Sequence, residues 1–143
     1  MGQLLSFPRF EAVLREEWPW PDFTPMEMAC KGTGIVTVHT DFMNRLQGIR
    51  DVYNGVMNVS SGYRAPEYNR KVSKTGYTGP HTTGRAVDIT IFGYDQIRLL
   101  RIALAHGMTG IGLKQKGPHH LRFMHLDDLS NDNSQPRPWN WTY

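Results

Sequence analysis

The sequence predicts an α+β fold, with a small antiparallel sheet and helices packed around it. Three observations support this expectation. Apolar residues recur at helical spacing in the first part of the chain. Short β-branched segments bounded by turn residues follow from the middle onward, and a further helical stretch separates them. Helices first, followed by strands with helices inserted, is the order expected of an α+β domain.

Two helices are predicted near the N-terminus. Apolar residues recur every three or four positions over 7–18, which predicts a helix that the proline-containing stretch 18–21 ends. The sequence Thr24-Pro25-Met26-Glu27 is a capping box with proline at the first helical position. A short second helix is therefore expected to begin at Pro25.

A longer helix is predicted after residue 40. Thr40 or Asp41 is expected to cap it, and Asn54-Gly55 is expected to end it. Steps of three and four separate the apolar residues of one face, which are Phe42, Leu46, Ile49 and Tyr53.

Shorter elements follow. Residues 56–60 predict a strand, and Pro66 begins a short helix over 66–72. Residues 73–80, rich in Gly, Ser and Thr, predict a loop. The β-branched, apolar residues 89–92 predict a buried strand.

The last third of the chain predicts one helix and a pair of strands. The helix covers 94–106 and ends at a glycine. Residues 109–113 and 120–126 predict two antiparallel strands around a Gly-Pro turn. Trp139 and Trp141, in the tail, are expected to cover the sheet.

Composition limits the class of protein. With 143 residues, 39% of them hydrophobic, the chain is large enough for one packed domain. We expect one domain over 1–143, with a helical N-terminal segment over 1–22 and a C-terminal tail over 129–143. The one cysteine, Cys30, excludes an internal disulfide framework and a cysteine-based zinc site.

Charge and hydropathy limit the partners. The net charge of +3 fits an anionic polymer, although it serves solubility equally well. The sequence has no Lys/Arg run or recognition-helix pattern, so nucleic acid is not expected. No stretch approaches 18 apolar residues, so membrane insertion is not expected. Residues 1–6 lack the features of a signal peptide, so we expect synthesis in the cytoplasm, and we expect a monomer.

The most informative stretch runs from His81 to Asp88. If His81 lies in the loop that enters the strand carrying Asp88, seven residues allow both side chains to reach one point. Imidazole and carboxylate are zinc ligands, and His125 is the candidate third ligand. Three protein ligands with one open position are typical of catalytic zinc sites. The alternative is three unrelated polar residues.

This pattern resembles the zinc peptidases that cut D-amino-acid bonds in bacterial cell walls. They include D-Ala-D-Ala carboxypeptidases, murein endopeptidases and phage endolysins, and the Hedgehog signalling domain carries the same zinc site. The resemblance runs from about Phe23 to Trp141. It includes Ser61-Gly62-Tyr63-Arg64, the stretch from His81 to Asp88, Gly110-Ile111-Gly112 and Met124-His125.

The resemblance implies a Hedgehog-like peptidase fold and one zinc ion per chain, bound by His81, Asp88 and His125. It also implies that Arg64 faces the metal and steadies the oxyanion or the substrate carbonyl. The same wall is expected to contain the substrate-binding residues Ser61, Tyr63, Asn69 and Thr82. Relatives often have a serine two residues before the first histidine ligand, where this chain has Gly79, so one substrate hydrogen bond is either missing or supplied by Thr78 or Thr82.

The general base is less well defined. Many relatives have Glu or Asp three residues before the last histidine ligand, but this chain has Arg122, which cannot act as a base. One branch has a histidine five residues before that ligand, which corresponds to His120, and we favour His120. Strand alternation favours the neighbouring His119, and both could instead be exposed turn residues. Asp127 is a further option, but it is better placed to orient His125.

The resemblance predicts a zinc-dependent peptidase that hydrolyses amide bonds of the peptidoglycan stem or cross-link by metal-activated water. We favour an endolysin-type endopeptidase that acts on the bacterial cell wall after phage-mediated release. The alternatives are a D-Ala-D-Ala carboxypeptidase, a non-catalytic zinc-containing module that binds cell wall, and a docking domain of a phage particle. Arg122, at the usual position of the acid, is the feature that favours a non-catalytic module.

Overall fold

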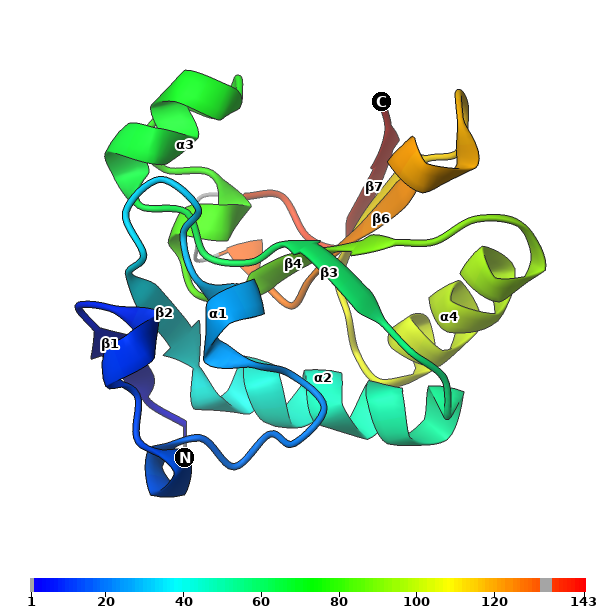
Figure 1. Ribbon diagram of the computed structural model, residues 1–143. Coiled ribbons are helices and arrows are strands. Elements are labelled where there is room, and N and C mark those ends of the chain that lie inside the picture. The colour runs from blue at the N-terminus through cyan, green and yellow to red at the C-terminus, as the bar shows by residue number, and fades with distance from the viewer. Residues whose placement is uncertain (1, 132–134) are drawn as a thin grey trace.

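A five-stranded sheet forms the centre of the molecule (Figure 1). The computed structural model describes residues 2–131 and 135–143. The strands, in their order across the sheet, are β3 (Asn58–Ser61), β4 (Ala86–Thr90), β6 (Phe123–Asp127), β5 (Gly110–Lys114) and β7 (Trp139–Thr142). The first four pair antiparallel, as predicted, and β7 adds a parallel strand beside β5.

A second, two-stranded sheet pairs β1 (Leu4–Phe7) with β2 (Val36–His39). The helix predicted over 7–18, and with it the helical character of segment 1–22, is therefore wrong. The segment instead contains β1 and two single 3-10 turns, η1 (Phe10–Ala12) and η2 (Arg15–Glu17). Antiparallel pairing with β2, about thirty residues away, satisfies the backbone of β1 and overrides the local periodicity.

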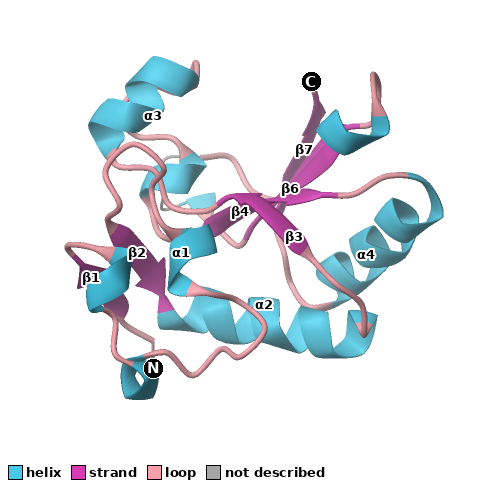
Figure 2. Cartoon of the chain, in the orientation of Figure 1, coloured by secondary structure: helices cyan, strands magenta, loops and turns pink. Residues whose placement is uncertain are grey.

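Four α-helices lie in the described part of the chain, and they agree with the predictions in position. They are α1 (Pro25–Met28), α2 (Thr40–Tyr53), α3 (Pro66–Val72) and α4 (Gly93–Ala105), shown in Figure 2. The predicted capping box is present, because Thr24 Oγ1 accepts from the Glu27 N–H and Glu27 accepts from the Thr24 N–H.

The ends of α2 differ slightly from the prediction. His39 is its N-cap, in place of Thr40 or Asp41, and its Nδ1 accepts the Asp41 N–H. Asn54 ends the helix in the left-handed conformation, with φ of 53°. No helix among the described residues is long and apolar enough to cross a membrane.

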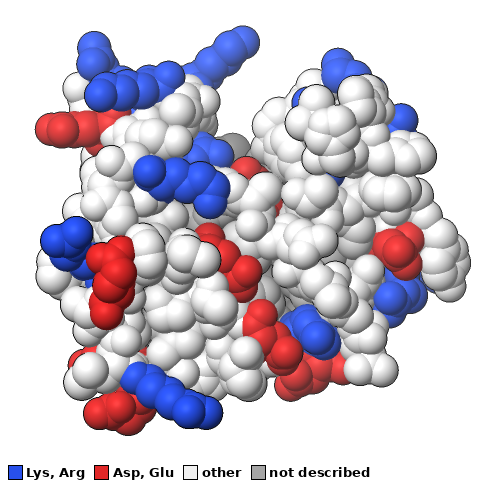
Figure 3. Space-filling view, in the orientation of Figure 1, with Lys and Arg blue, Asp and Glu red and all other residues white. Residues whose placement is uncertain are grey.

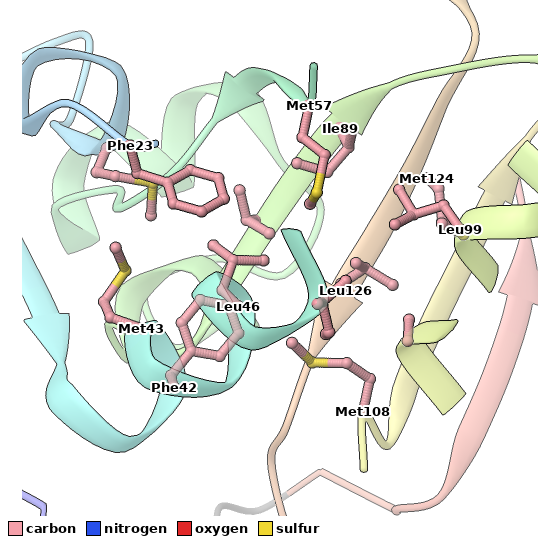
Figure 4. Close-up of a cluster of buried hydrophobic side chains, with 14 of the residues drawn as sticks. Phe23, Phe42, Met43, Leu46, Met57, Ile89, Leu99, Met108, Met124 and Leu126 are labelled. Carbon is pink, nitrogen blue, oxygen red and sulfur yellow. The ribbon is translucent and has the colours of Figure 1, made fainter. Parts of the chain in front are cut away.

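One face of the five-stranded sheet packs on α2 and α4 and forms the hydrophobic core (Figure 4). Because side chains alternate along a strand, Ile89 of β4 and both Met124 and Leu126 of β6 point into this core. Asp88, which precedes Ile89, and His125, which lies between Met124 and Leu126, point to the opposite face. The same alternation that fills the core therefore presents two of the predicted metal ligands together.

Candidate metal centre

Three different elements bring the predicted ligands together. Asp88 and His125 are direct partners across the antiparallel pair β4–β6. His81 lies in the 3-10 turn η3 (Pro80–Thr82) just before β4, and its carbonyl accepts the Arg64 N–H. The three side chains are buried, and their ligand atoms lie within 4.8 Å of one another.

The closest atoms of the three ligands form a nearly equilateral triangle. His81 Nε2 lies 3.2 Å from Asp88 Oδ1 and 3.2 Å from His125 Nδ1, and His125 Nδ1 lies 3.1 Å from Asp88 Oδ1. Atoms bound at about 2.0–2.2 Å to a tetrahedral zinc ion lie roughly 3.3–3.6 Å apart. A small outward adjustment would fit the triangle to that ion.

The tautomers of both imidazoles direct lone pairs into this triangle. His81 Nδ1 lies 2.7 Å from the Gly62 carbonyl, which can only accept, so Nδ1 carries the proton and Nε2 is free to bind a metal. His125 Nε2 lies 2.7 Å from Asp127 Oδ2 and donates to that carboxylate, which leaves the Nδ1 lone pair for the metal. Two nitrogen lone pairs and a carboxylate oxygen therefore converge on one point that can hold a metal ion.

A proton and a metal ion compete for this position. Burial lowers the pKa of His125, but hydrogen bonds to Asp127 and Asp88 outweigh burial and raise it. Burial lowers the pKa of His81, which favours the neutral imidazole that a metal needs. Burial would raise the pKa of Asp88, but the neighbouring His81 and His125 lower it, so Asp88 is ionised at neutral pH.

Arg64 points at the site and is held from two sides. Its Nε donates to Ser61 Oγ at 3.1 Å, one terminal nitrogen donates to Asn69 Oδ1 at 3.1 Å, and the other lies 3.4 Å from Asp88 Oδ2. The structure therefore places Ser61 and Asn69 beside Arg64. Asn69 is fully buried and also donates to Thr75 and the Gly76 carbonyl, so it supports the wall of the site from behind.

An open cleft of about 800 Å³ lies over the three ligands. Figure 3 shows the molecule hollowed between α3, which carries several Lys and Arg side chains, and the end of the sheet with β6 and β7. Among the described residues that line the cleft, the metal ligand Asp88 is the one acid. The other polar and aromatic residues of the lining include Arg64, Lys74, Phe123, Arg137, Trp139, Trp141 and Tyr143.

The remaining predicted residues lie outside the described lining of the cleft. His119 and His120 are exposed in the 3-10 turn η4 (His119–Leu121), and the His119 ring stacks on Phe92 with centroids 4.2 Å apart. The Tyr63 N–H donates to the Met28 carbonyl, and Thr82 Oγ1 donates to the Gly79 carbonyl at 2.7 Å. The roles of these four residues stay predictions.

The contact predicted between Asp127 and His125 is present. Asp127 has a second partner, Arg137, which no pattern in the sequence indicated. Arg137 donates to both oxygens of Asp127, at 2.9 and 2.8 Å. Burial would raise the pKa of Asp127, but the hydrogen bonds from Arg137 and His125 lower it to about 2. Asp127 is fully buried, so it orients His125 and does not face the cleft as a base.

Trp139 and Trp141 were expected to cover the sheet, but they belong to its edge strand and lie at the side of the cleft, with Trp139 exposed. Both lie in β7 and line the cleft, and the Trp141 ring packs on His125 with centroids 5.0 Å apart. A wide spacing in the sequence separates these residues from the ligand motif, so no local pattern indicated the contact.

A buried triangle of two imidazoles and a carboxylate, open to a cleft on one side, could hold a metal ion that keeps an open coordination position. The family model for Peptidase M15 matches residues 21–127, three quarters of the chain, including all three ligands. The chain therefore belongs to the Peptidase M15 family. No curated protein and no solved structure matches it.

Proposed function

We propose that the protein is a zinc-dependent peptidase that hydrolyses amide bonds in the peptide stem or cross-link of peptidoglycan. The observation that carries this proposal is the triangle of His81, Asp88 and His125 at the floor of the cleft, in a chain of the M15 family. Two neutral imidazoles and one carboxylate are a zinc-type donor set, and the open side leaves room for water and substrate.

Bound zinc would supply a Lewis acid that lowers the pKa of water to about 7 and polarises the scissile carbonyl. The residues of the chain supply the rest. Asp127 keeps the His125 Nε2 proton away from the ligand triangle, and the Gly62 carbonyl does the same for His81 Nδ1. Arg64, fixed by Ser61 and Asn69, presents a cation beside the metal position, where negative charge develops in the transition state.

We favour an endopeptidase of the endolysin type that acts on the bacterial cell wall as a monomer. The cleft over the ligands is open rather than enclosed, as a substrate that continues on both sides of the cut bond requires. A D-Ala-D-Ala carboxypeptidase is the second candidate, because Lys74 and Arg64 in the lining could hold a terminal carboxylate. A non-catalytic wall-binding module is the third, because Arg122 occupies the usual position of the acid.

Mass spectrometry of the soluble products from purified sacculi tests the proposal. The protein is incubated with zinc, with excess chelator, and as an Asp88→Asn variant. An endopeptidase releases fragments cut within the cross-link or stem, whereas a carboxypeptidase releases free D-alanine. Sacculi that stay intact with the zinc-loaded protein, while still binding it, would identify a wall-binding module instead.

A further inference from the structure

A chain of buried contacts lies behind the ligand His125. Asp127 Oδ2 accepts the His125 Nε2 proton at 2.7 Å, and the Arg137 guanidinium spans both Asp127 oxygens. Asp127 is completely buried and the Arg137 side chain is 4% exposed. A carboxylate held by a planar fork on one side and an imidazole on the other has one orientation available.

The same arginine reaches His125 by a second route. Its guanidinium carbon lies 5.5 Å from the centroid of the Trp141 ring, and that ring packs on His125 with an interplanar angle of 48°. Arg137 therefore reaches one metal ligand both through Asp127 and through Trp141. We refer to Asp127, Arg137 and Trp141 together as the His125 clamp.

Two glycines of β5 provide the space for this clamp. A Cβ at Gly110 would lie 2.2 Å from Asp127 Oδ1, and a Cβ at Gly112 would lie 2.5 Å from Trp141 Nε1. Because β5 lies between β6 and β7, Gly110 pairs directly with Asp127 and Gly112 pairs directly with Trp141. Because these two positions have no side chain, the Asp127 carboxylate and the Trp141 indole can lie across β5 towards His125.

Arg137 also has a fixed backbone. Its N–H donates to Asn131 Oδ1 at 2.7 Å, and its second terminal nitrogen donates to the Pro136 carbonyl. The family match ends at residue 127, so Arg137 and Trp141 lie outside it. Two of the three clamp residues therefore come from the C-terminal segment beyond the family match.

We propose that Arg137 is a positioning residue that sets the metal affinity of the site by fixing the tautomer and the orientation of His125. This inference rests on the metal centre of the proposed function, but not on turnover. Outer contacts of this kind typically change metal affinity by about 10–100-fold. A purely structural role, in which Arg137 only neutralises a buried acid, would change stability and leave the zinc affinity of the folded protein unchanged.

Arg85 offers a matched control. It holds the next carboxylate, Asp128, with the same two-pronged geometry, at 2.8 and 2.9 Å. Asp128 is also buried, but its interactions are with Arg85 and Arg45 and not with a metal ligand. A substitution of either arginine by lysine therefore weakens a buried bidentate ion pair, whereas only one of the two pairs contacts His125.

The test is a zinc dissociation constant, measured by competition with a chromogenic chelator, for the wild-type protein, Arg137→Lys, Arg137→Gln and Arg85→Lys. Circular dichroism first establishes that each variant is folded. We expect about 10–100-fold weaker zinc binding in the Arg137 variants and wild-type affinity in Arg85→Lys. Should Arg137→Gln not fold, Arg137→Lys carries the comparison alone.

Two results would overturn the inference. One is wild-type zinc affinity in a folded Arg137→Lys protein, and the other is an equal loss of affinity in Arg85→Lys. A wild-type protein that binds no zinc removes the metal centre, and with it both this inference and the proposed function. A wild-type protein that binds zinc without cutting sacculi contradicts only the proposed peptidase activity, because the affinities are measured without substrate.

Discussion

Asp88 Oδ1 and His125 Nδ1 lie 3.1 Å apart on neighbouring strands, as direct partners in the β4–β6 ladder. Because both residues belong to the central antiparallel pair of the sheet, the distance between two ligands is set by backbone hydrogen bonds and not by loop conformation. His81 is the one ligand supplied from outside the sheet, and its Nδ1 hydrogen bond to the Gly62 carbonyl fixes its ring. The site is therefore preorganised for a metal ion.

We expect one zinc ion per chain, lost when a ligand is removed. Asp88→Asn and His125→Ala should each retain a small fraction of the stoichiometric metal after dialysis, because two ligands cannot replace three. Inductively coupled plasma mass spectrometry measures the content. Asp95→Asn, a change at an exposed acid of α4, is the control and should keep one zinc ion. Stoichiometric zinc in His125→Ala would remove His125 from the site.

For the two neighbouring histidines of η4, the sequence and the structure lead to different expectations. A general base at His120 would make His120→Ala slower by ~10²–10⁴-fold with zinc retained. Since His119 and His120 are exposed and lie outside the described lining of the cleft, we expect both alanine variants to keep zinc and near wild-type turnover. Steady-state kinetics on a stem peptide decides, and a large loss in either variant would establish that histidine as the base.

Arg64 is expected to act in the transition state. Its position beside Asp88 leads us to expect that Arg64→Ala lowers kcat by ~10²–10³-fold and raises KM less, with zinc retained. Lysine restores the charge but not the fork that contacts Ser61 and Asn69 together, so Arg64→Lys should recover little. Arg70→Ala, a change at α3 outside the described lining, is the matched control. Unchanged kcat in Arg64→Ala would contradict this role.

His39 is expected to make stability depend on pH. Burial, and then the charge of Arg85, lower the pKa of His39, so the unfolded chain takes up the proton first. The contribution of His39 to stability is therefore complete above its unfolded pKa of about 6.5 and is lost as pH falls through its lower folded pKa. The physical reason is that a protonated Nδ1 cannot accept the Asp41 N–H that caps α2.

The variant His39→Asn tests this dependence, because an asparagine oxygen accepts that hydrogen bond at any pH. As pH falls below about 6.5, wild type should lose stability relative to His39→Asn, compared with the difference between the two proteins at about pH 7.5. Urea unfolding with chelator present removes the contribution of the metal ligands. An unchanged difference over this pH range would show that the cap does not titrate.

Gly112 is expected to tolerate no side chain. Alanine at this position would place its Cβ 2.5 Å from Trp141 Nε1, so the indole must move off β5 and away from His125. We expect a loss of about 1–3 kcal/mol in unfolding free energy. Gly48→Ala is the control, since its Cβ would meet only His106 at 3.8 Å, and it should stabilise α2 by about 0.5–1 kcal/mol. Equal melting temperatures for wild type and Gly112→Ala would contradict the crowding.

The parts of the fold that follow from local rules could be predicted from the sequence. The capping box at Thr24 and the left-handed Asn54 are determined by a few neighbouring residues, and both are present. The spacing of His81 and Asp88, together with strand alternation, was enough to bring these two residues together. The proximity of His125 depended on a long-range pairing, which the resemblance to a known family supplied.

The parts that depend on distant pairing could not be predicted in this way. Phe7 fits a helical pattern, but its antiparallel partner Val36 lies far along the chain and decides in favour of a strand. Arg137 lies ten residues beyond Asp127 and follows no motif, so its contact is visible only once β7 lies beside β5. Strand alternation would place His119 on the same face as His125 only if the strand began at His119, whereas β6 begins at Phe123 after a 3-10 turn.

The two consecutive acids at the end of β6 have a consequence for how the metal centre assembles. Asp127 is paired with Arg137 on one face of the sheet, while Asp128 is paired with Arg85 and Arg45 elsewhere. A slip of β6 by one residue would move Asp127 away from Arg137, leave a buried charge unpaired and replace His125 by an apolar neighbour. A misaligned strand is therefore destabilised in the absence of metal, so the three candidate metal ligands come together only once β6 has paired with the correct residues of β4.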